Sequence, residues 1–385
     1  MGETDTIVRR LTDILDKDRT LADRLEASLV KARKVAESQL DREKFKALQW
    51  PTTLGQYEKY LQKFIRWIPQ ESDTISISDR LSQFYWLIDQ KTDDDETLLV
   101  QMSESFQNWL TEFARQWGSF LDTTESFSPE ILRSFSDRPE YELGDSMVNG
   151  APNTPSGWLT FNQFFARRLN GGLRPIAEPG SNLVITRPAD SQLLHVFDID
   201  SDSNIPATTL KGTHTYGNIK QLLEGSRYAE SFARGTFIHY LLTPFDYHRL
   251  HLPVGGLVKE SFVVQGKVVQ RIDLQDHQLV VRDSALTGYE FWQTRGVVTI
   301  DTTGCDAGNI GVVAVIPVGQ WQVASVVLTA VEGKHMAKGE EFGYFQFGGS
   351  ETIVLLQEGV AAQVDTDKSH RRVGEFAARC SPLCS

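Results

Sequence analysis

Cysteine, long apolar runs and positive charge are all scarce in this chain. The three cysteines, Cys305, Cys380 and Cys384, are too few among 385 residues for a scaffold held by disulfides. The longest apolar stretch, residues 312–318, is interrupted by Pro317 and falls short of the roughly 20 residues that a membrane-spanning helix needs. With 39 Lys and Arg against 51 Asp and Glu, the net charge is −12. We therefore expect no nucleic-acid partner, because phosphates are bound through basic side chains.

The same scarcities indicate a compartment and argue against a metal. The first ten residues, MGETDTIVRR, lack the apolar core of a secretory signal, so we expect a cytoplasmic protein. We expect no transmembrane segment, because no apolar run is long enough, and at most peripheral membrane contact, because the acidic balance gives no general attraction to anionic membranes. Cys380 and Cys384 are close enough in sequence to share a metal ion, but no nearby His or second Cys pair accompanies them. We predict free thiols and no metal site.

Apolar residues recur at helical spacing through the first 150 residues, which predicts an N-terminal helical domain over 1–150. Ser128 followed by Pro129 predicts a further helix start, since Ser caps free amides and Pro fits the first turn. One stripe is Ile7, Leu11, Ile14 and Leu15, continued by Leu21, Leu25 and Leu29; the others are Tyr57, Tyr60, Leu61 and Phe64, and Phe106, Trp109, Leu110, Phe113 and Trp117. The aromatic stripes are typical of a packed core, although a docking face for lipid or protein has the same pattern.

Beyond a segment rich in Gly, Asn, Pro and Ser at 145–158, the pattern changes to short runs rich in Val and Ile. These runs are bounded by Gly, Asp or Pro and predict strands. They cover residues 236–242, 256–264, 278–281, 296–300, 310–317, 323–330 and 352–357. The predicted fold class is therefore α+β, with the helical domain followed by a mainly antiparallel β domain over residues 151–385.

Two segments of the β half contain candidate acid–base residues. Asp190 follows a Pro-fixed turn, where an Asp alone is typical of a turn residue. His248 and His251 lie three residues apart beside Asp, Tyr and Arg. Histidine takes and returns a proton near neutral pH more easily than other side chains, so this pair favours a catalytic role. A structural hydrogen-bond network and a zinc pair are the alternatives, although no Cys or Glu lies at metal-site spacing.

A third segment, residues 342–351 (FGYFQFGGSE), ends with Gly348, Gly349 and Ser350. A tight β-turn explains two successive glycines. A nucleophilic Ser350 approached closely by a backbone carbonyl explains them too. The order Asp, His, Ser along the chain fits an orienting carboxylate, a base and a nucleophile. A serine hydrolase is one such enzyme, but the G-x-S-x-G elbow is missing.

Residues 155–360 resemble the phosphatidylserine decarboxylase family, because several of its motifs occur here in order. The helical N-terminal half resembles, more loosely, the extension found on soluble relatives such as fungal tryptophan decarboxylases. The motifs are Phe161-Asn162-Gln163-Phe164-Phe165, Arg167-Arg168-Leu169, Arg174-Pro175-Ile176, Pro188-Ala189-Asp190, Lys211-Gly212 with Tyr216 and Leu222-Leu223, Asp246-Tyr247-His248-Arg249 with His251 and Pro253, and Gly348-Gly349-Ser350.

The resemblance implies a cofactor that the chain makes from itself. His251, oriented by Asp190, would take the proton of Ser350, whose oxygen then attacks the carbonyl of Gly349. Elimination would cut the chain between Gly349 and Ser350, and Ser350 would become a covalent pyruvoyl group. The large and small chains are expected to stay associated. The pyruvoyl carbonyl would form a Schiff base with a substrate amine and draw electrons as carbon dioxide leaves. His248 would then protonate the carbanion, a task suited to a pKa near ambient pH.

The chain departs from the family pattern around the serine. The common motif has one Gly preceded by Leu or Val and a Ser or Thr after the serine, whereas here Phe347 precedes two glycines and Glu351 follows. The double-Gly form resembles the soluble amino-acid decarboxylases more than the lipid enzymes. We therefore expect a free amino acid as substrate, an aromatic one among the candidates.

Two alternatives remain open at this point. The first is a phosphatidylserine decarboxylase that makes phosphatidylethanolamine from the serine head group. The second belongs to another class, an uncleaved binding module or a serine hydrolase. The binding-module hypothesis rests on residues 333–345, whose sequence is typical of a carrier-type β-hairpin.

Overall fold

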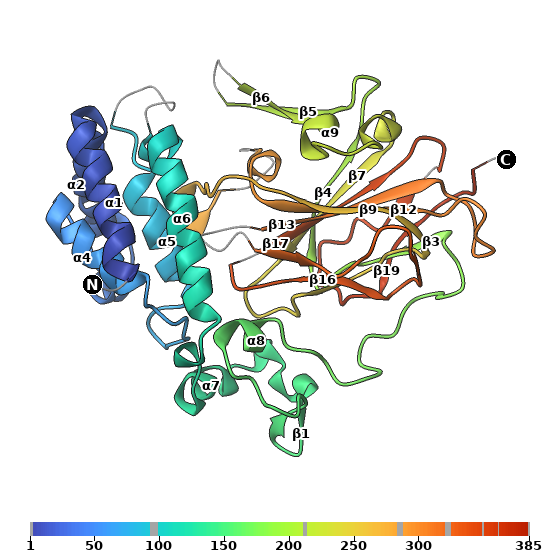
Figure 1. Cartoon of the computed structure of the whole chain (residues 1–385), viewed down its shortest axis with the longest axis horizontal. Coiled ribbons are helices and arrows are strands. Elements are labelled where there is room, and N and C mark those ends of the chain that lie inside the picture. The colour runs from blue at the N-terminus through green and yellow to red at the C-terminus, as the bar shows by residue number, and fades with distance from the viewer. Residues whose placement is uncertain are drawn as a thin grey trace.

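The computed structural model describes residues 3–92, 99–210, 214–282, 288–319, 325–348, 350–360 and 362–383. The helices of the first 121 residues gather on one side of the molecule and most strands lie on the other, with the short helix at 219–222 beside the strands (Figure 1). The helices are α1 Glu3–Lys17, α2 Arg19–Gln39, α3 Arg42–Ala47, α4 Leu54–Phe64, α5 Ile77–Ile88, α6 Glu104–Leu121, α7 Pro129–Ser136, α8 Phe161–Phe165 and α9 Ile219–Leu222. The strands are β1 Met147–Val148, β2 Ala151–Pro152, β3 Val184–Thr186, β4 Gln192–Asp198, β5 Asn204–Leu210, β6 His214–Asn218, β7 Thr236–Leu242, β8 Arg249–His251, β9 Gly256–Val264, β10 Ile272–Gln275, β11 Gln278–Val281, β12 Arg295–Asp301, β13 Val312–Gly319, β14 Val326–Leu328, β15 His335–Met336, β16 Glu341–Phe345, β17 Ser350–Leu356, β18 Gln363–Val364 and β19 Phe376–Arg379.

The N-terminal apolar stripes form helices, as predicted, and side-chain caps decide where these helices begin. The stripe that runs from Ile7 to Leu29 is divided into α1 and α2, because the Asp18 carboxylate accepts a hydrogen bond from the Leu21 amide at 3.0 Å. Helix α7 begins at Pro129, and Ser128 caps it as predicted. The sequence pattern thus located the helices but not the break at Asp18.

The β half is built around a seven-stranded sheet with the order β15-β9-β12-β13-β17-β7-β4. Every neighbouring pair in this sheet is antiparallel, so the predicted α+β class with a mainly antiparallel β part is confirmed. Strand β13 is buried along its whole length, which explains its continuous apolar sequence. Strand β17, which begins at Ser350, lies inside the sheet between β13 and β7.

The predicted hairpin over residues 333–345 is wrong. Strand β15 pairs with β9, whereas β16 pairs with β14 and β8 in a separate three-stranded sheet. The two strands lie close in sequence, but the turn at 337–340 sends them into different sheets. The feature on which the binding-module hypothesis rested is therefore missing from these described residues.

One hydrophobic cluster runs from the helices into the β half. It contains Ile7 and Leu25 of the first helices together with Val313 and Leu356 of the large sheet. A second cluster lies on the opposite face of the sheet, beneath β5 and α9, where Ile219 is fully buried. The predicted domain boundary at residue 150 stays a prediction, and the first cluster crosses it.

A buried ion pair also joins the two halves. Asp89, just after α5, lies 2.6 Å from Nε of Arg271 and accepts a hydrogen bond from the amide of Ile272 at 3.0 Å. Gln101 donates to the same carboxylate at 2.7 Å and to the carbonyl of Gln270 at 2.9 Å. Burial raises the pKa of Asp89 to about 6, so the carboxylate is still charged at neutral pH. The helices are thus fixed to the segment that leads into β10.

We expect Asp89→Ala to destabilise the protein by about 3–5 kcal/mol, because Arg271 would lose its carboxylate in a buried position. Urea unfolding followed by tryptophan fluorescence measures the change. The control is Asp16→Ala, which removes an ion pair with Arg19 whose two side chains are 62% and 74% exposed. That change should cost less than about 1 kcal/mol. Equal losses for the two variants would contradict a role for Asp89 in joining the halves.

Candidate active site

The two predicted catalytic histidines lie on the connection that follows β7. The chain turns at Thr243–Asp246, where the Asp246 carboxylate accepts hydrogen bonds from the amide and hydroxyl of Thr243 at 2.6 and 2.8 Å. His248 precedes β8 and His251 ends it. Strand β8 pairs with β16, which leads directly to the Gly348–Ser350 segment. Local turn chemistry thus brings both histidines beside that segment.

His251 is held in one tautomer by its two neighbours. Its Nδ1 lies 2.8 Å from the carbonyl oxygen of Gly339, so Nδ1 carries the proton and donates. Nε2 is then the acceptor and lies 3.1 Å from the hydroxyl of Tyr247. Burial lowers the pKa of His251, while the charges of Glu341 and Asp190 partly oppose that shift. A neutral imidazole with a basic Nε2 is the form that a general base requires.

His248 is more deeply buried than His251. Its ring stacks on Phe165 with the centroids 3.8 Å apart, and its Nε2 lies 3.3 Å from the carbonyl oxygen of Pro244. Burial lowers the pKa of His248 to about 3, well below the near-neutral value that the sequence led us to expect. The imidazole is therefore neutral in this structure. Phe165 covers the ring from a helix 83 residues earlier in the sequence, so no local sequence pattern could indicate this burial.

Asp190 has different partners from the one that the resemblance implies. Its carboxylate accepts hydrogen bonds from Nε of Arg174 at 3.1 and 3.2 Å and from Nη2 at 2.7 Å. It also accepts one from the backbone amide of Val373 at 2.7 Å. Tyr247 and Gly339, not Asp190, contact the ring nitrogens of His251. In this structure the influence of Asp190 on His251 is electrostatic, because its negative charge opposes the lowering of the His251 pKa.

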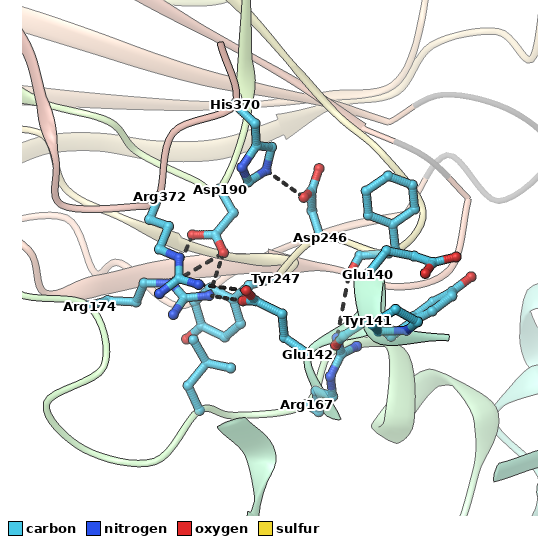
Figure 2. Close-up of a pocket in the computed structure, with 13 residues that line it drawn as sticks. Glu140, Tyr141, Glu142, Arg167, Arg174, Asp190, Asp246, Tyr247, His370 and Arg372 are labelled. Atoms are coloured by element: carbon cyan, nitrogen blue, oxygen red, sulfur yellow. Dashed lines mark hydrogen bonds and ion pairs between the residues drawn. The ribbon is translucent and has the colours of Figure 1, made fainter. Parts of the chain in front are cut away.

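A cavity of about 250 Å³ opens beside Asp190 and is lined by charged residues (Figure 2). Glu142 accepts hydrogen bonds from Arg174 at 3.3 Å and from Arg372 at 2.5 Å. His370 lies 2.7 Å from Asp246, and this hydrogen bond raises the pKa of His370. The cavity thus joins the helical half, the middle of the β half and the C-terminal segment. Its lining residues are Pro139, Glu140, Tyr141, Glu142, Arg167, Leu169, Arg174, Asp190, Phe245, Asp246, Tyr247, His370 and Arg372.

Ser350 opens strand β17. Its Cα is paired with Leu242, the last residue of β7, and with Gly319, the last residue of β13. Gly348 has a φ of 152°, a conformation that favours glycine, which explains one residue of the double-Gly motif. Gly349 and the side chain of Ser350 lie outside the described residues, as do Lys211, Gly212 and Cys384. The predicted cut thus falls where strand β17 begins.

The residue after the serine forms a pair that the sequence did not predict. Oε2 of Glu351 lies 3.0 Å from Nε2 of His239 on β7, with side chains only 3% and 1% exposed. Glu351 points to the opposite face of the sheet from Ser350, because side chains alternate along a strand. The signal in the sequence for such a buried pair was His239, a titratable residue inside the predicted apolar strand 236–242.

Neither a metal cluster nor a membrane-spanning helix occurs in the parts of the chain that the structure describes. No group of three His, Cys, Asp or Glu side chains there is arranged to hold a metal ion. No helix within those ranges is long and apolar enough to cross a bilayer. Cys380 is buried and Cys305 half-buried, and both are free thiols.

Comparisons with known proteins identify the family. Residues 161–378 match the family model described as phosphatidylserine decarboxylase. Phosphatidylserine decarboxylase proenzyme 3 of Schizosaccharomyces pombe is 31% identical over 229 residues, which cover 58% of this chain and 22% of that protein. The Clostridium perfringens (strain SM101) phosphatidylserine decarboxylase proenzyme is 30% identical over 257 residues, 66% of this chain and 78% of its own length. Decarboxylase iboD of Amanita muscaria is 27% identical over 275 residues, 66% of this chain and 77% of that protein.

The match to the S. pombe protein thus spans less than a quarter of that relative's length, while the matches to the other two span about three quarters. The family model, by contrast, covers more than half of this chain and includes Asp190, both histidines and Ser350. The chain belongs to the phosphatidylserine decarboxylase family.

Proposed function

We propose that this chain is a pyruvoyl-dependent decarboxylase that makes its own prosthetic group by cutting itself between Gly349 and Ser350. Members of the family carry a covalent pyruvoyl group derived from serine. The observation that carries the proposal is the placement of Ser350 at the start of β17, directly opposite the end of the strand that leads to His248 and His251. The segment before the cut is tied to the same connection, since the Phe345 amide donates to the carbonyl of His248 at 3.0 Å.

In the proposed self-cleavage, His251 and Ser350 carry out the first step. Nε2 of His251 takes the proton of the Ser350 hydroxyl, and the oxygen attacks the Gly349 carbonyl carbon. The peptide C–N bond breaks as its nitrogen gains a proton, which leaves an ester. Loss of the Ser350 α-proton then expels the Gly349 carboxylate and leaves a dehydroalanine. Its tautomer takes up water and releases ammonia, which yields the pyruvoyl group. Tyr247 and Gly339 hold the His251 ring for the first step.

In the mature enzyme the pyruvoyl group supplies an electron sink for the electrons that carbon dioxide leaves behind. We assign the return of a proton to the carbanion to His248, whose backbone carbonyl accepts a hydrogen bond from the Phe345 amide upstream of the cut. Its pKa of about 3 in the uncut chain means that a charged substrate or the new chain ends would have to raise that pKa. Phe165 and Pro244 keep the ring oriented for that transfer.

The two chains should remain together after the cut. Strand β17 is hydrogen-bonded to β13 on one side and β7 on the other, and β19 pairs with β3. Val373 also donates to Asp190, and Arg372 pairs with Glu142. The small chain thus forms the inside of one sheet and one wall of the charged cavity.

For the substrate, we propose a free amino acid, with an aromatic one as the first to test. The net charge of −12 supports this choice, because it disfavours approach to anionic bilayers. The names of two relatives reported above support phosphatidylserine as the second candidate. The third relative is named only as a decarboxylase.

Denaturing mass spectrometry of the purified protein tests the proposal. We expect two chains, residues 1–349 and 350–385, that elute together in native buffer. Borohydride reduction in the presence of L-tryptophan should add the mass of the amine to the small chain only. Carbon dioxide release from L-tryptophan and from phosphatidylserine vesicles then separates the substrates. A single intact chain would refute the proposed self-cleaving decarboxylase. Carbon dioxide release from vesicles alone would refute a free amino acid as the substrate.

A further inference from the structure

Two residues shortly before the predicted cut, Gln346 and Phe347, are held by contacts with helices α6 and α8. Phe347 is 1% exposed, and its ring meets three aromatic rings edge-on. Two of them, Phe161 at 5.2 Å and Phe165 at 5.1 Å, belong to α8, and the third, Trp117 at 5.6 Å and 88°, belongs to α6. Edge-to-face pairs of this kind have a preferred geometry in addition to their buried area. The ring of Phe347 therefore has little freedom to move.

Trp117 is itself anchored within the helices. Its Nε1 donates to the carbonyl of Trp67 at 2.8 Å, and its ring stacks on Trp67 and contacts Phe64 at the end of α4. The side chain is fully buried. The contact with Phe347 thus comes from a rigid part of the helical half.

Hydrogen bonds also connect the segment before the cut to α6. The Phe347 amide donates to Oδ1 of Asn162 at 3.1 Å, and Nδ2 of Asn162 donates to the carbonyl of Gly118 on α6 at 3.2 Å. One residue earlier, Gln346 donates to the Asp122 carboxylate at the end of α6 at 3.2 Å. Asn162 is 2% exposed, so its two bonds form inside the protein. A side-chain ring and a backbone amide of the same residue are thus both tied to α6.

Helix α6 ends beside α8 in Figure 1 and lies outside the part of the chain that matches the family model, residues 161–378. We propose that α6 positions the segment before the cut for self-cleavage, with Trp117 as the positioning residue that acts through Phe347. This inference rests on the proposed function. Attack of a hydroxyl on a carbonyl depends on placement to within about 1 Å, so a fixed Phe347 two residues upstream limits where the Gly349 carbonyl can lie.

The test is the rate of self-cleavage, followed on denaturing gels after a short pulse of labelled synthesis in a cell-free system. The variants are Trp117→Leu, Phe347→Leu and the two combined, with Trp117→Phe as the conservative change. The matched control is Trp109→Leu on the same helix, because Trp109 is equally buried but donates to the Ile7 carbonyl on α1. The control is also combined with Phe347→Leu.

We expect Trp117→Leu to slow cleavage by about 2- to 10-fold, the range that an aromatic pair supports, and Trp117→Phe to restore most of the rate. The double variant with Phe347→Leu should be little slower than the slower single variant, because both changes break one contact. When Trp109→Leu is combined with Phe347→Leu, the fold-reductions in cleavage rate of the two single variants should multiply. The uncut Trp117→Leu chain should also resist hydroxylamine, which cuts the ester, because the delayed step is the attack itself.

Cleavage of Trp117→Leu at the wild-type rate would overturn the inference, as would multiplying effects with Phe347→Leu or a stalled chain that hydroxylamine cuts. These outcomes presuppose a wild-type chain that cuts itself. A wild-type chain that never cuts would instead refute the proposed function, so the two failures are distinguishable.

Discussion

Ser350→Ala should leave one polypeptide of 385 residues that releases no carbon dioxide from any candidate substrate. Without the hydroxyl there is no nucleophile for the Gly349 carbonyl, so no ester forms and no pyruvoyl group follows. Because Ser350 enters β17 through its backbone pairing with Leu242 and Gly319, the alanine should not disturb the sheet. Denaturing mass spectrometry and a carbon dioxide assay measure the two effects.

The matched control is Thr352→Val on the same strand. Thr352 is fully buried, and its Oγ1 has no hydrogen-bond partner among the described residues, so the nearly isosteric change removes a hydroxyl at little cost. This variant should cut itself and decarboxylate as the unchanged protein does. A Ser350→Ala protein that still separates into two chains would place the cut elsewhere and refute the assignment.

The two histidines should have separable effects. His251→Gln should slow self-cleavage by about 100-fold or more, because it removes the base that takes the serine proton. His248→Gln should still give two chains, but with carbon dioxide release lowered by about 10²- to 10⁴-fold, because the carbanion loses its proton donor. Gel analysis and the carbon dioxide assay, made on the same preparations, distinguish these outcomes. His335→Gln, an exposed position on β15, is the control and should leave both activities unchanged.

The pH dependence of self-cleavage follows from the lowered pKa of His251. A base works while unprotonated, and burial moves protonation of His251 below its ordinary value of 6.5. The rate should therefore stay level as the pH falls through about 6.5 and decline only at lower pH. Tyr247→Phe, which removes the hydroxyl at Nε2, should change this profile.

Loss of cleavage in His248→Gln with normal cleavage in His251→Gln would mean that the two roles are reversed.

The local sequence pattern predicted helices and strands well where apolar residues follow one clear periodicity. The predicted strand bounds 236–242 and 256–264 agree with β7 and β9, because both runs are flanked by turn residues. Strand β8 was not predicted, since three residues are too few to show a period. The hairpin over 333–345 was wrongly predicted for a different reason. Its two strands have partners far away in sequence, and sequence spacing carries no information on that choice.

At the candidate site, too, the sequence indicated which residues matter but not which residues they contact. Asp190, His248 and His251 were selected because of their chemistry, and the fold brings them to one region. Their contacts depend on packing: Arg174 takes the carboxylate of Asp190, and Phe165 covers His248. The variants described above test the proposed roles of His248, His251 and Ser350.

The position of β17 inside the large sheet has a consequence for the refolding and kinetic stability of the cleaved protein. Before the cut, the strand enters the sheet as part of one chain, so folding is unimolecular. After the cut, a denatured molecule would have to capture its lost strand from solution, and recovery would depend on protein concentration. The cut chain would then persist because it opens slowly, and durability would be set by the height of the unfolding barrier.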